Sequence, residues 1–299
     1  MILTEGLFMR SIFMNSLVIS DTNGELFPIL SPLLDCKIKV LNFLEPQQSN
    51  TYNPFEYIRA KKDIDKMVDV LIDCGLGFRI VNTPLIKTEK ALLRAICYYA
   101  HKELPKEQQN FGRVMEILKT AAISATEENF YSSELDVLFG ELACKNPKSK
   151  TAQQYKIYKE ILADGVEYYG LDFISVFMAV NMRLSSFHDR NIIDLMNTDT
   201  LDLENMGTEE TALFVMTPKK DYNSPDSIAF TLYMQIFDTL KLKADKEHDG
   251  KLPVPLLYLF DENSMDFICG LISAKHGEER SKYISAMGVQ ILDGLKNNG

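Results

Sequence analysis

Two acidic residues, Asp261 and Glu262, directly follow an apolar run at residues 254–260. An acid at the carboxyl end of a buried strand can hold Mg²⁺ beside the phosphates of a nucleotide, and a following glutamate can polarise the attacking water. The pair is therefore a candidate Walker B element, with both residues catalytic and Asp261 the metal ligand if Mg-ATP binds. The same pattern is also typical of a buried strand that meets a solvated turn, so the pair alone leaves both interpretations open.

A Walker B element works together with a glycine-rich loop that ends in Gly-Lys-Ser/Thr. The backbone N–H groups and the lysine of that loop bind the phosphates. The sequence contains no such tripeptide, Gly75-Leu76-Gly77 lacks the lysine and the following hydroxyl residue, and the first lysine of the chain is Lys37. No cofactor-binding residue can be assigned, and we expect no bound cofactor.

The composition is that of an ordinary globular protein. The 299 residues correspond to about two domains at the usual ~150 residues each. Acidic residues outnumber basic ones by 42 to 32, which gives a net charge of −10. A general basic field for nucleic acid is thereby excluded, and we expect no direct binding of DNA.

Cysteine, histidine and apolar spacing exclude further classes. The five cysteines and four histidines are scattered without Cys-x-x-Cys pairs, which predicts free thiols in a reducing cytoplasm and no zinc site. No segment reaches the ~18–20 apolar residues of a membrane span. The sequence therefore predicts a cytoplasmic chain.

Hydrophobic patterning predicts two α/β segments. Runs that are apolar on both faces are typical of parallel strands, and residues with apolar positions at helical spacing connect them. Strands are expected at 17–20, 38–43, 211–216, 254–260 and 287–292, and helices at 63–74 and 227–240. A further helix is expected over 25–35, although Pro28 and Pro32 weaken it.

Between these segments the pattern is entirely helical. Five helices are expected at residues 88–101, 107–122, 133–142, 151–162 and 171–187. Their aromatic residues are predicted to be core and not platforms for stacking bases: Tyr98, Tyr99, Phe111, Phe173 and Phe177. The expected organisation is a first α/β part at 1–84, an all-α insertion at 85–196 and a second α/β part at 197–299.

Several segments are similar, in order along nearly the whole chain, to the TraG/TraD-type conjugative coupling proteins, the hexameric ATPases of type IV secretion. Residues 20–26 resemble the family's TDPKGEL segment, and residues 37–42 with 52–59 resemble its KVLNL…YNPF.YIR run. Residues 89–111, 211–218 and 228–240 resemble its later helical and strand segments, and 284–296 its ISa.ivlQ…QLK element. The resemblance implies a RecA-like P-loop NTPase sheet interrupted by an all-α domain.

The departures from the family pattern concern the nucleotide site. Where the family has its Walker A loop, residues 2–15 contain Gly6 as their only glycine and no lysine. The DPKGE motif has become Asp21-Thr22-Asn23-Gly24-Glu25, and the loop after Glu262 is rebuilt. The membrane anchor that precedes Walker A in the family is missing from this sequence.

The leading hypothesis is a non-hydrolysing relative or fragment of a coupling protein. By resemblance, the helical insertion would dock relaxosome or secreted-substrate proteins, and the chain could associate with a full-length coupling protein at the inner face of the cell membrane. The alternative is an active ATPase, or one completed by a neighbouring subunit, that binds Mg-ATP. Arg10, Asp261, Glu262 and Gln290 are the residues expected to serve that site. A third reading is an unrelated α/β protein with chance similarity.

Overall fold

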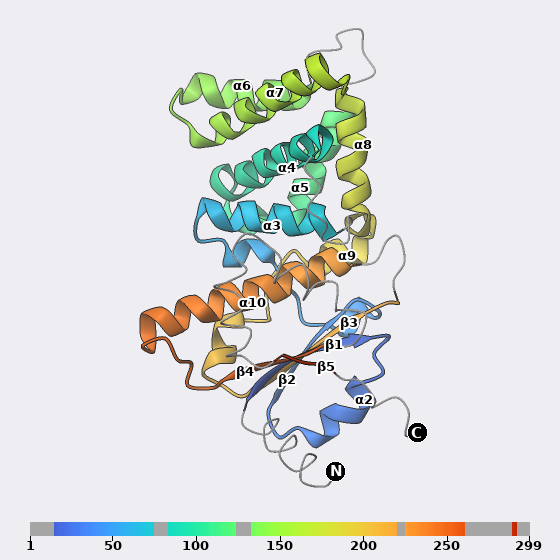
Figure 1. Cartoon of the computed structure of the whole chain (residues 1–299), viewed down its shortest axis with the longest axis vertical. Helices are drawn as coiled ribbons and strands as arrows, with labels where there is room; N and C mark the ends of the chain where they lie inside the picture. The colour runs from blue at the N-terminus through green and yellow to red at the C-terminus, as the bar shows by residue number, and fades with distance from the viewer. Residues whose placement is uncertain (1–14, 75–82, 124–132, 220–224, 261–288, 292–299) are drawn as a thin grey trace. The chain divides into compact units, whose positions relative to one another are not determined.

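The computed structural model describes residues 15–74, 83–123, 133–219, 225–260 and 289–291. Contacts between Cα atoms divide the chain into two compact units (Figure 1). The sheet unit comprises Met1–Tyr52 and Asp199–Gly299, and the helical unit comprises Asn53–Thr198.

The sheet unit is built on five parallel strands in the order β2-β3-β1-β4-β5. The strands are β1 (Ser16–Thr22), β2 (Lys37–Asn42), β3 (Thr211–Thr217), β4 (Leu256–Phe260) and β5 (Val289–Ile291). All five lie within or beside the segments predicted from apolar runs, so the expected parallel sheet is confirmed. The central strand β1 is buried along its whole length, as a parallel strand covered on both faces should be.

Helices cover both faces of this sheet (Figure 1). On one face, alternate residues of β1, β3 and β4 form a core with Leu26 and the short helix α2 (Phe27–Leu30); there the ring of Phe27 meets Phe214 edge-on at 5.0 Å. On the other face, Tyr233 of α10 (Asp226–Glu247) packs edge-on against Phe260 at 5.3 Å. Strand residues therefore alternate between two apolar layers.

The connection from β1 to β2 differs from the helix expected over 25–35. It contains the four-residue α2 and then a 3₁₀ turn, Ser31–Leu33. Pro28 and Pro32 each stand within the first two positions of one of these elements. Proline has no N–H for the preceding turn, so each proline starts an element and a continuous helix cannot form.

The helical unit contains seven α-helices among the residues that the structure describes. They are α3 (Lys61–Cys74), α4 (Pro84–Glu103), α5 (Phe111–Ile123), α6 (Glu134–Lys145), α7 (Lys150–Tyr169), α8 (Phe173–Arg183) and α9 (Arg190–Leu195). Helix α4 is the centre of the unit and packs against α3, α5, α7 and α8. Aromatic rings stack between its elements, with Phe111 on Phe187 at 4.6 Å and Phe139 on Tyr155 at 4.2 Å.

The aromatic prediction holds for part of its set. Tyr98 and Phe111 are buried core residues, as expected. Phe173 and Phe177 are only half-buried and stack on each other at 6.1 Å along α8. Helix α8 therefore carries apolar side chains beyond those that the core covers.

The contact division places the first boundary at Tyr52/Asn53, whereas the sequence pattern favours residue 84. The difference is helix α3, which packs against α4 and so joins the helical unit. The three-part domain division remains a prediction.

Candidate functional site

The carboxyl edge of the sheet is the place where a ligand would bind in a fold of this kind. In open parallel sheets, ligands bind beyond the carboxyl ends of the strands where the chain connections diverge. In the strand order, the chain passes from β1 to β2 on one side of β1, whereas β4 and β5 lie on the other side of β1. The connections therefore diverge at β1. The register pairs Ile19 of β1 with Leu259 of β4, so these two strands end close together.

The acid at the end of β1 is held by the chain itself. Asp21 is fully buried, and its two carboxylate oxygens accept hydrogen bonds from the backbone N–H of Leu26 at 2.9 Å and of Phe27 at 2.8 Å. These N–H groups stand at the start of α2 and have no partner within the helix, so the carboxylate caps it. This geometry gives Asp21 a structural role.

The turn after Asp21 closes onto the end of β3. Asn23 and Gly24 both have positive φ, 65° and 70°, which a short asparagine side chain and a glycine tolerate. The Asn23 N–H donates to the Thr217 carbonyl at 2.8 Å, and its side-chain oxygen accepts from the Lys219 N–H at 3.1 Å. These two hydrogen bonds therefore hold the Asp-Thr-Asn-Gly segment, at the end of β1, against the end of β3. The segment does not form a phosphate cradle, because the Asn23 and Gly24 N–H groups already donate to carbonyls of the chain.

The predicted catalytic residues lie at or beyond the limits of the described residues. Asp261 and Glu262 follow directly after the last residue of β4, and these two, like Arg10, lie outside the described residues. Gln290 lies in β5, where its backbone pairs with Leu259 of β4. The structure therefore places the strand that precedes the acidic pair beside β1 and β5, and the catalytic assignment of Asp261, Glu262 and Gln290 remains a prediction.

The Tyr-Asn-Pro-Phe motif marks the point where the chain enters the helical unit. The Tyr52 hydroxyl donates to the buried Gln235 side chain at 2.6 Å within the sheet unit. Within the helical unit, Asn53 accepts from the Phe55 N–H at 3.1 Å and donates to the Gln109 carbonyl at 2.9 Å. These side-chain contacts explain the residue types of Tyr52 and Asn53.

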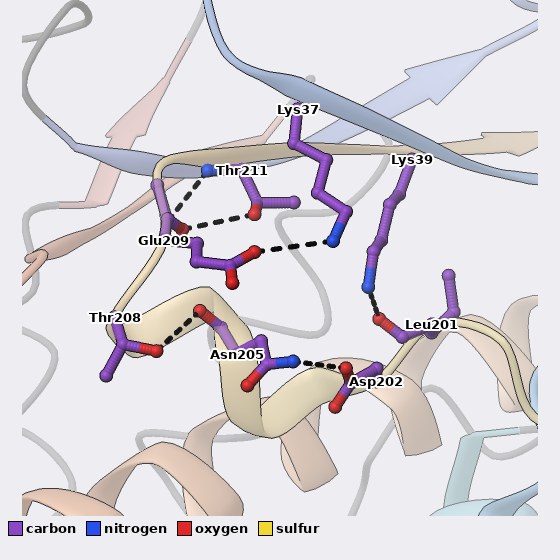
Figure 2. Close-up of polar contacts among 9 residues, drawn as sticks. Lys37, Lys39, Leu201, Asp202, Asn205, Thr208, Glu209 and Thr211 are labelled. Atoms are coloured by element: carbon purple, nitrogen blue, oxygen red, sulfur yellow. Dashed lines mark hydrogen bonds and ion pairs between the residues drawn. The ribbon is translucent and has the colours of Figure 1, made fainter.

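A group of polar contacts at the amino ends of β2 and β3 was missed by the sequence analysis (Figure 2). Lys39 is buried and donates to the Leu201 carbonyl (Figure 2). Burial lowers its pKa, and the nearby Asp202 carboxylate acts in the opposite direction. The alternation of side chains along β2 could have predicted the burial of Lys39, because Lys39 shares a face of the strand with the buried Leu41.

The neighbouring pair in this group is weaker. Lys37 and Glu209 form an ion pair at 3.3 Å, and both side chains are more than half exposed. Such pairs contribute little to stability. The group lies at the amino edge, opposite the edge where a ligand would bind. Its contacts join the strand ends to Leu201 and Glu209, which flank the 3₁₀ segment Leu203–Gly207.

A buried ion pair joins α4 and α8 in the helical unit. The Glu89 side chain is fully buried, and Arg183 Nε lies 3.2 Å from its Oε2. Burial raises the Glu89 pKa above its ordinary value, while the Arg183 charge and hydrogen bond act to lower it. Its other oxygen, Oε1, has no hydrogen-bond partner among the described residues.

Among the described residues, no three His, Cys, Asp or Glu side chains come together in a group that could hold a metal ion. Over the same residues, each helix is either too short or too polar to cross a bilayer.

Comparisons with known proteins decide the family. The model of the family described as "Type IV secretory system Conjugative DNA transfer" matches residues 11–265. This chain belongs to that family. The match covers well over half of the sequence, and the resemblance to conjugative coupling proteins is thereby confirmed. A comparison with the curated proteins finds no match.

A solved structure of a coupling protein shares the fold of this family member. The bacterial conjugative coupling protein TrwBdeltaN70, in its unbound monoclinic form, matches with a TM-score of 0.51 and 14% identity, over 97% of this chain and 57% of that one. The plasmid coupling protein TrwB in complex with ADP and Mg²⁺ matches with a TM-score of 0.46 and 11% identity, over 94% and 63%. At this identity the first match shows the fold alone, and the RecA-like P-loop NTPase fold is confirmed. The chain spans less than two thirds of the length of these structures.

Proposed function

We propose that this chain is a non-hydrolysing component of conjugative DNA transfer that acts by docking partner proteins. The family membership supports a place in type IV secretion. The observation that carries the non-hydrolysing role is the sequence, which contains no Gly-Lys-Ser/Thr loop to bind the phosphates. Asp21, an acid of the family motif, caps α2 and has a structural role.

The proposed docking part is the helical block at residues 85–196. Its helices form a packed unit around α4 with its own aromatic core, so it can present a rigid surface to a partner. Relaxosome proteins or secreted substrates are the proposed partners, together with a full-length coupling protein, at the cytoplasmic face of the cell membrane.

The non-hydrolysing role is tested by ATP turnover and nucleotide affinity of the purified full chain. We expect phosphate release at the background rate with and without Mg²⁺. Mg-dependent turnover that disappears in the Asp261→Ala variant would contradict the proposal and would establish Asp261 as a metal ligand.

The docking role is tested separately by cross-linking the full chain to purified relaxosome proteins of its own conjugative system. Cross-links concentrated in residues 85–196 are the expected result. Cross-links confined to the sheet unit, or none above those formed with an unrelated acidic protein, would contradict it.

A nucleotide site remains the second candidate. The observation in its favour is that β4 ends next to β1 and is followed at once by Asp261 and Glu262. In that case Mg-ATP would be held by Asp261 together with groups from a neighbouring subunit. Nucleotide binding that depends on protein concentration, and that Asp261→Ala abolishes, would favour this candidate.

A further inference from the structure

Helix α8 is apolar on two opposite faces. Val176 and Val180 are fully buried on the face that packs against α4. Ile174, Met178 and Met182 follow one another at intervals of four residues and are exposed by 47%, 58% and 71%. Side chains four residues apart share a face of a helix, and those two apart lie on opposite sides. We call these three residues the α8 ladder.

An apolar face of a helix is normally buried against a neighbouring element. Helix α8 instead lies along one side of the helical unit, across the ends of α3 and α4 (Figure 1). The ladder belongs to a wider concentration of exposed apolar residues. Of the eleven large hydrophobic side chains exposed among the described residues, six lie within residues 166–182.

The polar groups of α8 are engaged within the helical unit. Ser175 donates to the Asp172 carboxylate at 2.9 Å, and the Asn181 amide donates to the Phe177 carbonyl at 2.9 Å. Arg183 is held by the buried Glu89. Arg183, the one cation of α8, is therefore not available to cover the exposed side chains of the ladder. Contiguous exposed apolar surface of this kind marks interaction sites.

The charge near the amino end of the ladder selects the occupant, because Asp172 lies two residues before Ile174, whereas Arg183, after Met182, is paired with Glu89. Residues 160–182 contain four acids and neither lysine nor arginine. Asp164 and Glu167, in the last turns of α7, are exposed and form no ion pair with another described residue. Asp172 caps α8, and the Ser175 N–H at 2.7 Å lowers the Asp172 pKa, so this carboxylate stays ionised.

These charges disfavour three occupants. A second copy of the chain would bring the same four acids against themselves, and anionic lipid or nucleic acid would meet them with like charge. A cationic protein segment is attracted by the same charges. Methionine side chains adapt to different apolar partners, which suits the reception of a helix.

We infer that the α8 ladder is a docking face for a cationic amphipathic helix of a partner protein. The apolar side of that helix packs on Ile174, Met178 and Met182, and its lysine or arginine residues face the acids of α7 and Asp172. The inference rests on the proposed docking function of the helical block and gives that function a surface and a partner chemistry.

The test uses the full chain and two labelled synthetic peptides in fluorescence anisotropy. One peptide is an 18-residue helix with leucine on one face and lysine on its flanks, and the other carries glutamate in place of each lysine. We expect saturable binding of the lysine peptide that weakens as salt rises. The affinity of the glutamate peptide should be lower by a factor of about ten or more.

Variants assign the binding to the ladder. Met178→Ala with Met182→Ala should weaken the lysine peptide by about tenfold or more, because truncation of central apolar anchors has effects of this size. Both side chains are exposed, so the melting temperature should not fall. The matched control is Ile29→Ala in α2 of the sheet unit, which removes a side chain that is 60% exposed and should leave the affinity unchanged.

Four results would overturn the inference. These are equal binding of the two peptides, unchanged affinity in the methionine variant, a chain dimer that the methionine variant dissolves, and binding to anionic vesicles that the methionine variant abolishes. The same variant separates this inference from the docking function. If this variant still cross-links to relaxosome proteins through residues 85–196, the assignment of the ladder as the docking face is wrong, and the docking function is kept. If the wild type forms no such cross-links yet binds the lysine peptide through the ladder, the relaxosome docking function is wrong, and the ladder is kept as a binding face for a cationic helix.

Discussion

The buried pair of Glu89 and Arg183 gives a prediction whose size and pH dependence both follow from its geometry. Replacement of Arg183 by methionine keeps the length and the apolar part of the side chain and removes the charge. The Glu89 carboxylate then remains fully buried without the cation now 3.2 Å away. Removing one partner of a buried pair costs about 3–5 kcal/mol of unfolding free energy at neutral pH, because an uncompensated charge is left inside.

The sign of the pH dependence follows from the raised pKa of Glu89. Burial already holds this pKa above its ordinary value, and the loss of Arg183 removes the largest influence that lowers it. A carboxyl group whose pKa is higher in the folded state than in the unfolded state contributes stability that is fully present below the unfolded pKa. That contribution is lost as pH rises through the folded pKa. The deficit of Arg183→Met relative to the wild type should therefore be smaller at about pH 5 than at about pH 7.5.

Urea unfolding followed by far-UV circular dichroism measures this deficit, since the signal comes mostly from the helices. The double variant Glu89→Gln with Arg183→Met should regain much of the lost stability, because it leaves no buried charge. The control is Arg190→Met, which breaks the exposed pair of Arg190 with Asp194 at 3.8 Å in α9 and should change stability by less than about 0.5 kcal/mol. A deficit below about 1 kcal/mol, or one that is equal at both pH values, would refute the reasoning.

Three further predictions concern single side chains. Asp21→Ala should lower the stability of the sheet unit by about 3 kcal/mol and Asp21→Asn by less, because alanine leaves two N–H groups of α2 without an acceptor; hydrogen exchange of α2 measures both. Gly24→Ala should cost about 1 kcal/mol or more in thermal unfolding, because φ is +70° and the added Cβ would meet a side chain at 3.4 Å, whereas Gly170→Ala, with φ +65° and open space, should show the conformational cost alone. Tyr52→Phe should cost about 1–2 kcal/mol in urea unfolding, since the buried Gln235 oxygen loses its 2.6 Å donor, and an unchanged midpoint would contradict the structural role of this tyrosine.

The strands and most helices were predictable because their sequence patterns are strong. Parallel strands covered on both faces need continuous apolar runs, and β1, β3 and β4 have them. Helix α9 was missed because its six residues, Arg190–Leu195, give less than two turns of periodicity. Its one local signal was Asp189, whose side chain accepts from the Asn191 N–H at 2.8 Å as a helix cap.

Side-chain roles were less predictable than elements, because residue type does not fix the partner. Asp21 matches an acid of the family motif, yet its carboxylate binds backbone N–H groups five and six residues ahead. Only the fold of the following turn, with positive φ at Asn23 and Gly24, makes that contact possible. The exposure of Met178 and Met182 likewise depends on which face of α8 meets α4, and the sequence pattern of a helix with two apolar faces does not decide it.

The polar side chains at the sheet edge have hydrogen-bond partners within the chain, whereas the apolar side chains exposed on α8 lack a covering partner among the described residues. This difference bears on function. At the described carboxyl edge of the sheet, Asp21 and Asn23 have their hydrogen bonds met by the backbone of the same chain. A group that binds a nucleotide must be able to exchange such partners for phosphate or metal, and a buried cap can do so only by releasing the start of a helix. On α8 the situation is reversed, because Met178 and Met182 are exposed and have no buried contact to exchange. Covering these side chains releases no existing contact, so the binding of a cationic helix there disrupts nothing in the fold.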